Sequence, residues 1–243
     1  DKIHLFNLEL GNEHYHEART IEPGKRVVVV DSPFGRIGLA GPNAEALLKN
    51  ALGTVPVNPY DSITSDDVTV VRLPGPHTRF ELLAPLARLM SLWHVLSPRA
   101  TLVGAGPWSW LDIMAGIPAI LPGTVEEFVP QMANLELVGG VSFTKGCYPG
   151  QEIVARMHYL GRLKQRMFRA HVESALPPQP GTPVFAPDLP DQSTGTVLDA
   201  QPSPEGGYDL LAVVHLSSKE IGELHIAYND GPRLILKDLP YDG

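Results

Sequence analysis

The N-terminal half of the chain alternates between strand-like and helix-like spacing of its hydrophobic residues. A valine-rich stretch at 26–30 and the apolar residues at 34–40 each favour a strand. Apolar positions three and four residues apart then predict a helix over 44–52. Asn43 is a favoured residue before a first helical turn, and Gly53 is a favoured residue after a last one. The start of the chain therefore predicts strand, strand and helix.

The same alternation continues to the middle of the chain. Two strands are expected at 67–73 and 79–83, separated by a Pro-Gly-Pro turn. A second helix follows, with Pro85 in its first turn and with an apolar stripe made of Leu82, Leu86, Leu89, Met90 and Trp93. We expect Met90 and Trp93 to be core residues. A strand at 101–103 completes the order strand–helix–strand–strand–helix–strand, which is the ferredoxin-like pattern.

From about residue 165 the pattern becomes that of an all-β domain. Strands are expected at 195–198, 210–216 and 233–236, with proline- and glycine-bearing turns between them. The proline-rich stretch 177–193 is expected to be loop and turn. Short strands of this kind fit a small β-barrel or a sandwich. Together with the first half, they predict an α+β protein with a ferredoxin-like unit and a small C-terminal β-barrel.

The segment between these regions is rich in glycine and proline and contains the sequence KGCYPGQE at 145–152. The residue before a proline is pushed out of the helical region, so Tyr148-Pro149 predicts a turn. Residues 151–158 then favour a helix with Ile153, Val154 and Met157 on one side. A second glycine-rich stretch, GAGPWS at 104–109, lacks the third glycine of a dinucleotide-binding fingerprint and is excluded as one.

Cys147 is the single cysteine of the chain and lies in the loop before this helix, two residues after Lys145. A helix N-terminus and a nearby lysine both favour a thiolate, which is the reactive form of cysteine. The alternative is a buried cysteine that packs as a small apolar residue. Nucleophilic catalysis also needs a base, for which His158 is near in sequence. One cysteine alone does not hold a metal or an iron–sulfur cluster, because such sites need about four ligands.

The composition describes an ordinary globular protein of 243 residues, of which 43% are hydrophobic and 19% are charged. The apolar stretches are strand-sized, so we expect no membrane span, and the start of the chain has no signal-peptide pattern. A lone cysteine forms no internal disulfide, so we expect a cytoplasmic protein. The first residue is Asp rather than Met, which indicates trimming, processing or an incomplete start.

The net charge of −8 argues against a general nucleic-acid coat protein. The charge is unevenly distributed, because residues 143–169 carry one acid, Glu152, and six bases: Lys145, Arg156, Arg162, Lys164, Arg166 and Arg169. This basic strip has a net charge of +5, which leaves −13 for the rest of the chain. Such a strip either meets an anionic partner or is a solvated face, and the sequence favours neither.

A further stretch, Glu13-His14-Tyr15-His16-Glu17, contains residue types that ligate metals. If it forms a strand, both histidines lie on one face. Exposed pairs of this kind usually bind only adventitious metal. We therefore expect no resident metal ion.

The stretch from Trp108 to Gly161 resembles one family of proteins. The run KGCYPGQEIVAR at 145–156, preceded by FVPQ at 128–131, Asn134-Leu135 and GGVSF at 139–143, is similar to the YgfZ-like folate-binding, tRNA-modifying proteins. These proteins are bacterial relatives of the mitochondrial iron–sulfur assembly factors and of the glycine-cleavage T-protein, an aminomethyltransferase. The expected ferredoxin-like unit and β-barrel agree with the three-part ring of that family.

The resemblance implies a bound tetrahydrofolate or a one-carbon derivative of it. It also implies that Cys147, with Lys145 beside it, is the working group of the protein. The ligand-contacting positions that the match implies are Trp108, Gln131, Asn134, Gly146, Tyr148, Gln151, Glu152 and Arg156. Trp108 would stack on the pterin ring, since flat aromatic faces attract one another; its alternative role is core packing.

The resemblance further implies a role in assembling or repairing iron–sulfur enzymes. The implied partners are folate, in mono- or polyglutamylated form, and client enzymes such as a tRNA thiolating enzyme; direct RNA contact is allowed but not required. The basic strip would then face the glutamate tail of folate or the phosphates of RNA. The alternatives are a folate-dependent aminomethyl transferase and a scaffold with a vestigial channel. An accessory factor is favoured over an enzyme, because the T-protein carries aspartate where Cys147 stands.

Two departures from the family pattern accompany this match. Met114 stands where relatives often carry a glutamate that bonds to the pterin. Residues 1–33 lack a clear counterpart of the family's N-terminal segment and are expected to be a remnant of that folate-binding domain. The other expected parts are a ferredoxin-like unit at 34–103, a return segment of the folate-binding domain at 104–163, and the β-barrel at 164–243.

Overall fold

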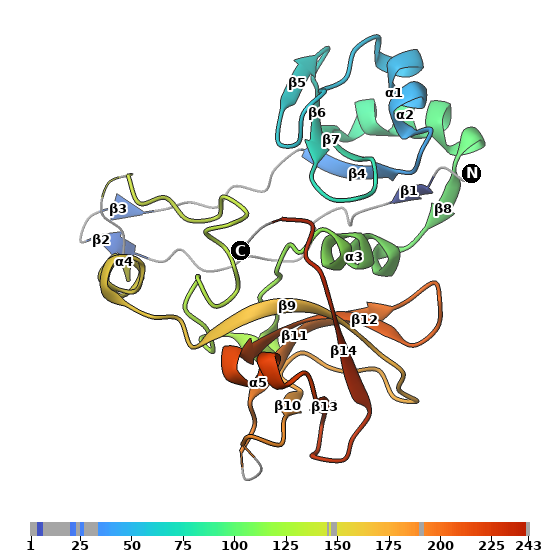
Figure 1. Cartoon of the computed structure of the whole chain (residues 1–243). Helices are drawn as coiled ribbons and strands as arrows, with labels where there is room; N and C mark the ends of the chain where they lie inside the picture. The colour runs from blue at the N-terminus through green and yellow to red at the C-terminus, as the bar shows by residue number, and fades with distance from the viewer. Residues whose placement is uncertain are drawn as a thin grey trace. The chain divides into compact units, whose positions relative to one another are not determined.

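The computed structural model describes residues 34–144, 146, 150–189 and 192–241. It also describes the backbone of three short strands, β1 (His4–Phe6), β2 (Thr20–Glu22) and β3 (Lys25–Arg26). The chain divides into two compact units, residues 1–108 (unit 1) and 109–243 (unit 2), both drawn in Figure 1. Most of the expected strand at 26–30, and the histidine-bearing stretch 13–17, lie outside the described residues.

Unit 1 is a sheet with two helices packed on it. The expected strands form as β4 (Phe34–Ala40), β6 (Val68–Leu73), β7 (Arg79–Pro85) and β8 (Thr101–Val103), and a further strand, β5 (Ser62–Ser65), pairs with β6. The expected helices form as α1 (Ala44–Leu52) and α2 (Leu86–Leu96), followed by a 3-10 turn at Ser97–Arg99. The order of elements confirms the ferredoxin-like prediction.

This sheet contains two strands that the sequence did not predict, β5 at one edge and β1 inside the sheet. Its strand order is β5-β6-β7-β4-β1-β8, so β1 lies between β4 and β8. Strand β1 runs antiparallel to β4, with His4 opposite Ala40, and parallel to β8, with His4 opposite Thr101. The N-terminal segment therefore widens the ferredoxin-like sheet by one strand. Three residues carry too few alternating positions for a sequence pattern to show this.

The core of unit 1 lies between its helices and the central strands. Leu48 of α1 and Phe80 of β7 have no exposed side-chain surface, and Leu92 of α2 is 3% exposed. Leu39 and Leu82 add further buried surface from β4 and β7. The helical spacing of apolar residues in α1 and α2 therefore produces the buried faces that it predicts.

Two expectations for the second helix are wrong. The helix begins at Leu86, because Pro85 ends β7 with an extended backbone, so Leu82 belongs to the strand. Met90 is 49% exposed and is not a core residue. Trp93, by contrast, packs against the core in a partly buried position, as expected.

Unit 2 is built on a closed barrel of six strands in the order β10-β11-β12-β9-β14-β13. Its strands are β9 (Gln165–Val172), β10 (Pro183–Phe185), β11 (Gly195–Pro202), β12 (Tyr208–His215), β13 (Leu224–Ile226) and β14 (Arg233–Lys237). This closure confirms the barrel. The stretch 177–193 is not loop throughout, because β10 lies in it, and Leu216 begins α5 (Leu216–Ile221) rather than ending a strand.

The barrel strands β9 and β12 bury residues on both faces. Ala170 and Val172 of β9 are buried in one cluster inside the barrel. Met167, on the other face of β9, packs in a second cluster with Ile113 and Ala133. Residues 210–214 of β12 are buried throughout. A strand covered on both sides needs a continuous hydrophobic run rather than an alternating one, which is what the sequence shows there.

The remaining helices are α3 (Ala105–Met114), a 3-10 turn at Pro122–Thr124, and α4 (Gln151–Leu160). Helix α4 confirms the helix expected at 151–158. The residue before it, Gly150, has a φ of 81°, in the left-handed region that favours glycine. Ile153 is 61% exposed, so the expected apolar side of α4 is only partly buried. In the described part of the chain, no helix combines the length and hydrophobicity that crossing a bilayer requires.

Candidate ligand-binding site

A pocket of about 600 Å³ opens on unit 2 where β9, α5 and β14 come together. Its apolar lining includes Phe168, Leu216, Leu239 and Tyr241. Its polar lining consists of Asn134, Arg166, Lys219, Lys237 and Asp238. Small-molecule sites are usually pockets of roughly 300–1,000 Å³ with mostly apolar walls and a few polar groups. The pocket has the size and the chemistry of such a site.

Three basic side chains reach this pocket from separate elements: Arg166 from β9, Lys219 from α5 and Lys237 from β14. The Lys219 ammonium lies 5.4 Å from the centre of the Phe168 ring, a cation–π distance. Lys219 and Lys237 are exposed, and neither forms an ion pair with the residues that the structure describes. With Asp238 as the acid of the lining, the pocket carries an excess of positive charge beside an apolar surface.

Asn134 holds the turn beside this pocket to the barrel. Its side chain is buried, with Nδ2 donating to the Met167 carbonyl at 2.9 Å and Oδ1 accepting from Arg166 Nη1 at 3.1 Å. Arg166 also forms an ion pair with Glu136 at 3.0 Å. The φ of Asn134 is 56°, a left-handed conformation that asparagine tolerates better than most residues. Asn134 therefore fixes both the turn and the direction of the Arg166 guanidinium.

Gln131 ties the same turn to α4. Its side chain is 2% exposed, and Nε2 donates to the Val154 carbonyl at 2.7 Å. The other amide atom, Oε1, is buried without a hydrogen-bond partner in the described structure. Most buried polar atoms in proteins are paired, so this unpaired oxygen is an exception. Gln131 therefore keeps one free acceptor beside α4.

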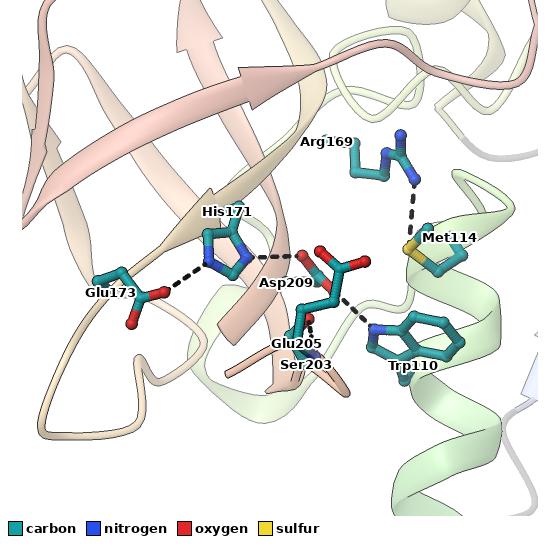
Figure 2. A network of polar contacts seen from close by, with 8 residues as sticks. All are labelled: Trp110, Met114, Arg169, His171, Glu173, Ser203, Glu205 and Asp209. Atoms are coloured by element: carbon teal, nitrogen blue, oxygen red, sulfur yellow. Dashed lines mark hydrogen bonds and ion pairs between the residues drawn. The ribbon is translucent and has the colours of Figure 1, made fainter. Parts of the chain in front are cut away.

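A chain of polar contacts links α3 to the barrel in unit 2, as Figure 2 shows. Trp110 Nε1 donates to Asp209 Oδ2 at 2.7 Å, and Asp209 Oδ1 lies 2.9 Å from His171 Nδ1. The other ring nitrogen of His171, Nε2, lies 3.3 Å from Glu173 Oε1. Ser203 and Glu205 are joined beside this network by a hydrogen bond from the Glu205 backbone N–H to Ser203 Oγ at 3.4 Å. The network holds the C-terminal half of α3 to β9 and β12.

The network shifts the pKa values of its two central groups in opposite directions. The hydrogen bond to Asp209 raises the pKa of His171, against a smaller lowering by burial, and Glu173 raises it further. Burial by itself raises the pKa of Asp209, but the hydrogen bonds from Trp110, His171 and Ser203 outweigh it, so the pKa is lowered overall. Both shifts favour the charged pair.

Arg169 of β9 lies beside the end of α3 with a weak partner. Its Nη1 is 3.2 Å from the Met114 sulfur, and its Nε is buried without a hydrogen-bond partner among the described residues (Figure 2). A thioether sulfur is a poor acceptor compared with a carboxylate. Methionine at position 114 therefore leaves the charge of Arg169 poorly compensated where a glutamate would pair with it.

Trp108 is placed by unit 1. Its indole is 6% exposed and covers Gly38, where an added Cβ would lie 2.5 Å from the ring. The Arg79 guanidinium lies 5.4 Å from the ring centre, a cation–π distance. In this position Trp108 packs within unit 1, and its stacking on a pterin stays a prediction.

The remaining predicted site residues belong to the stretch 145–156, around the cysteine in sequence. Lys145, Cys147 and Tyr148 lie outside the described residues. Gly146 is exposed, Gln151 begins α4 in a half-buried position, and Glu152 and Arg156 are exposed on α4. The structure thus brings Gln131 to α4 and Asn134 to the pocket. Within the described ranges, no group of three or more histidine, cysteine or acidic side chains comes together as a metal site.

Lys219 and Lys237 are the pocket residues that the sequence did not reveal. They are 18 residues apart and each stands alone in its local sequence, outside the basic strip. Closure of the barrel brings them to Arg166. Because a barrel joins distant strands, no local spacing could have signalled this grouping.

The fold defined by these two units is that of an aminomethyltransferase T-like protein. The solved structure of the glycine cleavage system aminomethyltransferase T from Bartonella henselae superposes with a TM-score of 0.64 at 18% identity. The match covers 85% of this chain and 59% of that one. No protein-family model matches the chain.

Sequence comparison gives the family. The chain is 32% identical to the tRNA-modifying protein YgfZ of Sodalis glossinidius and 30% identical to that of Serratia proteamaculans, in each case over 219 residues and 89% of its length. The YgfZ of Hamiltonella defensa is 30% identical over 202 residues, or 82% of this chain. The chain spans 66% of the length of the first two relatives and 60% of the third. It belongs to the family of the tRNA-modifying protein YgfZ.

Proposed function

We propose that this protein binds a reduced folate in the pocket between β9, α5 and β14, and that it supports iron–sulfur enzymes, including enzymes that modify tRNA. The observation that carries the proposal is the chemistry of the pocket, in which aromatic and apolar side chains adjoin Lys219 and Lys237. A folate joins a flat pterin and a benzoyl ring to an anionic glutamate tail, so it needs both kinds of surface. The relatives are tRNA-modifying proteins by name, which supports the second part.

Within the pocket, the rings of the ligand pack against Phe168 and Tyr241, since aromatic faces and edges attract one another. In this proposal these two rings take the part that the resemblance gives to Trp108. Tyr241 is held in place by its hydroxyl, which donates to the Gly116 carbonyl at 2.7 Å. The carboxylates of the tail pair with Lys219 and Lys237. Each added glutamate brings another carboxylate, so affinity rises with tail length and falls as salt screens the charges.

In the same proposal, Cys147 handles iron or sulfur in transit to a client enzyme. The resemblance assigns this position to the functional cysteine, and a thiolate is the form that binds metals and sulfur. Helix α4 begins at Gln151 with Gly150 before it, so the amide groups of a helix N-terminus follow Cys147 in sequence. The folate pocket and the thiol then act as separate parts of one accessory protein.

The second candidate function is aminomethyl transfer, which the fold favours through its likeness to an aminomethyltransferase T. A transferase of this kind would pass a one-carbon unit between an aminomethyl donor and tetrahydrofolate. An assay for methylenetetrahydrofolate formation separates the two functions, and we expect no turnover.

Calorimetric titration with tetrahydrofolates that carry one or three glutamates tests the pocket. The parent is expected to bind the triglutamate more tightly. The double variant Lys219→Gln/Lys237→Gln is expected to lose about tenfold in triglutamate affinity at low salt, with a smaller loss for the monoglutamate. The matched control, Arg162→Gln/Lys164→Gln, removes the same charge from the basic strip and is expected to bind like the parent. Equal affinities for both ligands, or an equal loss in the control, contradicts the assignment.

A further inference from the structure

Helix α4 leaves much of its apolar surface uncovered. Val154 is its buried side chain, whereas Ile153, Tyr159 and Leu160 are 61%, 68% and 83% exposed. A surface helix of a globular protein normally turns such residues to the core. Clustered exposed apolar residues on a folded protein mark an interaction surface.

An ordered group of rings forms one end of this surface. The His158 ring stacks on Phe143, with ring centres 3.9 Å apart and planes at 19°. Tyr159 meets His158 edge-on at 4.7 Å and Phe143 edge-on at 6.4 Å. Because the rings hold one another in place, the exposed Tyr159 is positioned before any partner arrives. Preorganised rings lose little conformational entropy when a partner stacks on them.

Three exposed cations lie on α4 or shortly after it in sequence: Arg156 on the helix, then Arg162 and Lys164. None of the three forms an ion pair with the described residues. The next bases of the strip differ, because Arg166 is paired with Glu136 and Arg169 contacts Met114. The cations around α4 therefore have no ion-pair partner among the described residues, whereas Arg166 and Arg169 in β9 contact Glu136 and Met114.

We propose that this α4 surface, formed by Phe143, Arg156, His158, Tyr159, Arg162 and Lys164, binds a single-stranded loop of RNA. Proteins that bind single strands combine aromatic platforms, on which bases stack, with cations that follow the phosphates. Both parts are present within one helix and its flanks. An acidic protein would match the charges but would not need the ordered rings. The net charge of −8 disfavours RNA elsewhere on the protein, and contacts between these cations and phosphates make the binding sensitive to salt.

Fluorescence anisotropy with a labelled RNA stem–loop, and with a loop-free RNA duplex of the same length, tests the proposal. The parent is expected to prefer the stem–loop. Tyr159→Ala is expected to weaken stem–loop binding by roughly 5- to 100-fold, and Tyr159→Phe to retain it, because stacking needs the ring and not the hydroxyl. Arg162→Gln/Lys164→Gln is expected to weaken binding and to reduce the slope of log affinity against log salt by about 1.4.

The control is the pocket variant Lys219→Gln/Lys237→Gln, which removes the same charge and is expected to bind RNA like the parent. The α4 variants in turn are expected to keep folate binding, so failure of this proposal and failure of the folate proposal are distinguishable. Unchanged binding by Tyr159→Ala, equal binding of duplex and stem–loop, or equal losses in both double variants overturns the proposal. Displacement of the RNA by a poly-glutamate peptide of equal charge at equal concentration also overturns it, in favour of an acidic protein partner.

Discussion

Asn134 shows how one side chain holds the pocket of unit 2 in shape. Its amide connects the Met167 carbonyl of β9 to the Arg166 guanidinium, and its backbone is left-handed with a φ of 56°. Asn134→Ala removes the amide that holds the Met167 carbonyl and one of the two partners of the Arg166 guanidinium, which keeps its ion pair with Glu136. We expect the free energy of unfolding to fall by about 2–4 kcal/mol, measured by urea denaturation followed by circular dichroism.

One further variant and one control separate the stabilisation by the Asn134 amide from that by its backbone conformation. Asn134→Gly accepts the left-handed backbone but lacks the amide, so it is expected to recover only the backbone part, about 1 kcal/mol. Asn50→Ala changes an exposed asparagine of α1 and is expected to cost less than about 0.5 kcal/mol. If Asn134→Ala were as stable as Asn50→Ala, the role of this amide would be wrong.

For single residues, the sequence predicted which positions matter better than it predicted the contacts that they make. The motif pointed to Gln131 and Asn134, and the structure uses one amide nitrogen of each to hold a main-chain carbonyl, of Val154 and Met167 respectively. Such contacts join positions 23 and 33 residues apart, which depends on the tertiary fold. Lys219 and Lys237 were missed for the same reason, since only the closed barrel brings them to one pocket.

Among the elements, the contact between α3 and the barrel depends on pH through His171 and Asp209. The pKa of His171 is raised by its hydrogen bond to Asp209, so its contribution is fully present below the unfolded pKa near ~6.5 and is lost as pH rises through the folded pKa. The pKa of Asp209 is lowered overall, so its contribution is present above the unfolded pKa near ~3.9 and is lost as pH falls through the folded pKa.

The pair therefore stabilises unit 2 most between about pH 4 and pH 6.5. We expect His171→Gln to lower the free energy of unfolding more at about pH 5.5 than at about pH 8.5, measured by urea denaturation at both values. His94→Gln, an exposed histidine of α2, serves as the control and is expected to have the same small effect at each pH. A His171→Gln effect that does not change with pH contradicts the coupling.

The elements with strong local patterns were predictable, and those without them were not. Helices α1 and α4 have apolar residues at helical spacing, and each is followed by a glycine. Their expected positions are confirmed within two residues. Strand β9 was missed because its buried residues alternate with Arg166 and Arg169, which look like surface charge in the sequence. Strand β1 depends on pairing with β4 and β8, far along the chain, which no local window contains.

In the whole molecule, separate surfaces of unit 2 are proposed for separate tasks. The pocket between β9, α5 and β14 is proposed for folate, and the α4 surface is proposed for RNA. Neither surface uses the residues of the other, because the pocket draws on Lys219 and Lys237 and the α4 surface draws on Arg162, Lys164 and Tyr159. Cys147, which precedes α4 in sequence, is the group proposed to act on iron or sulfur for a client enzyme.

The most direct measurement is the amount of thiolated nucleosides in tRNA from a bacterium that lacks its own YgfZ-family protein and expresses either this chain or its Cys147→Ser variant. Serine keeps nearly the same volume, but its hydroxyl does not ionise near neutral pH, so the variant has no thiolate. The account predicts that the parent restores thiolation and that Cys147→Ser does not, while both proteins bind folate with affinities that agree within about twofold. Full restoration by Cys147→Ser would contradict it.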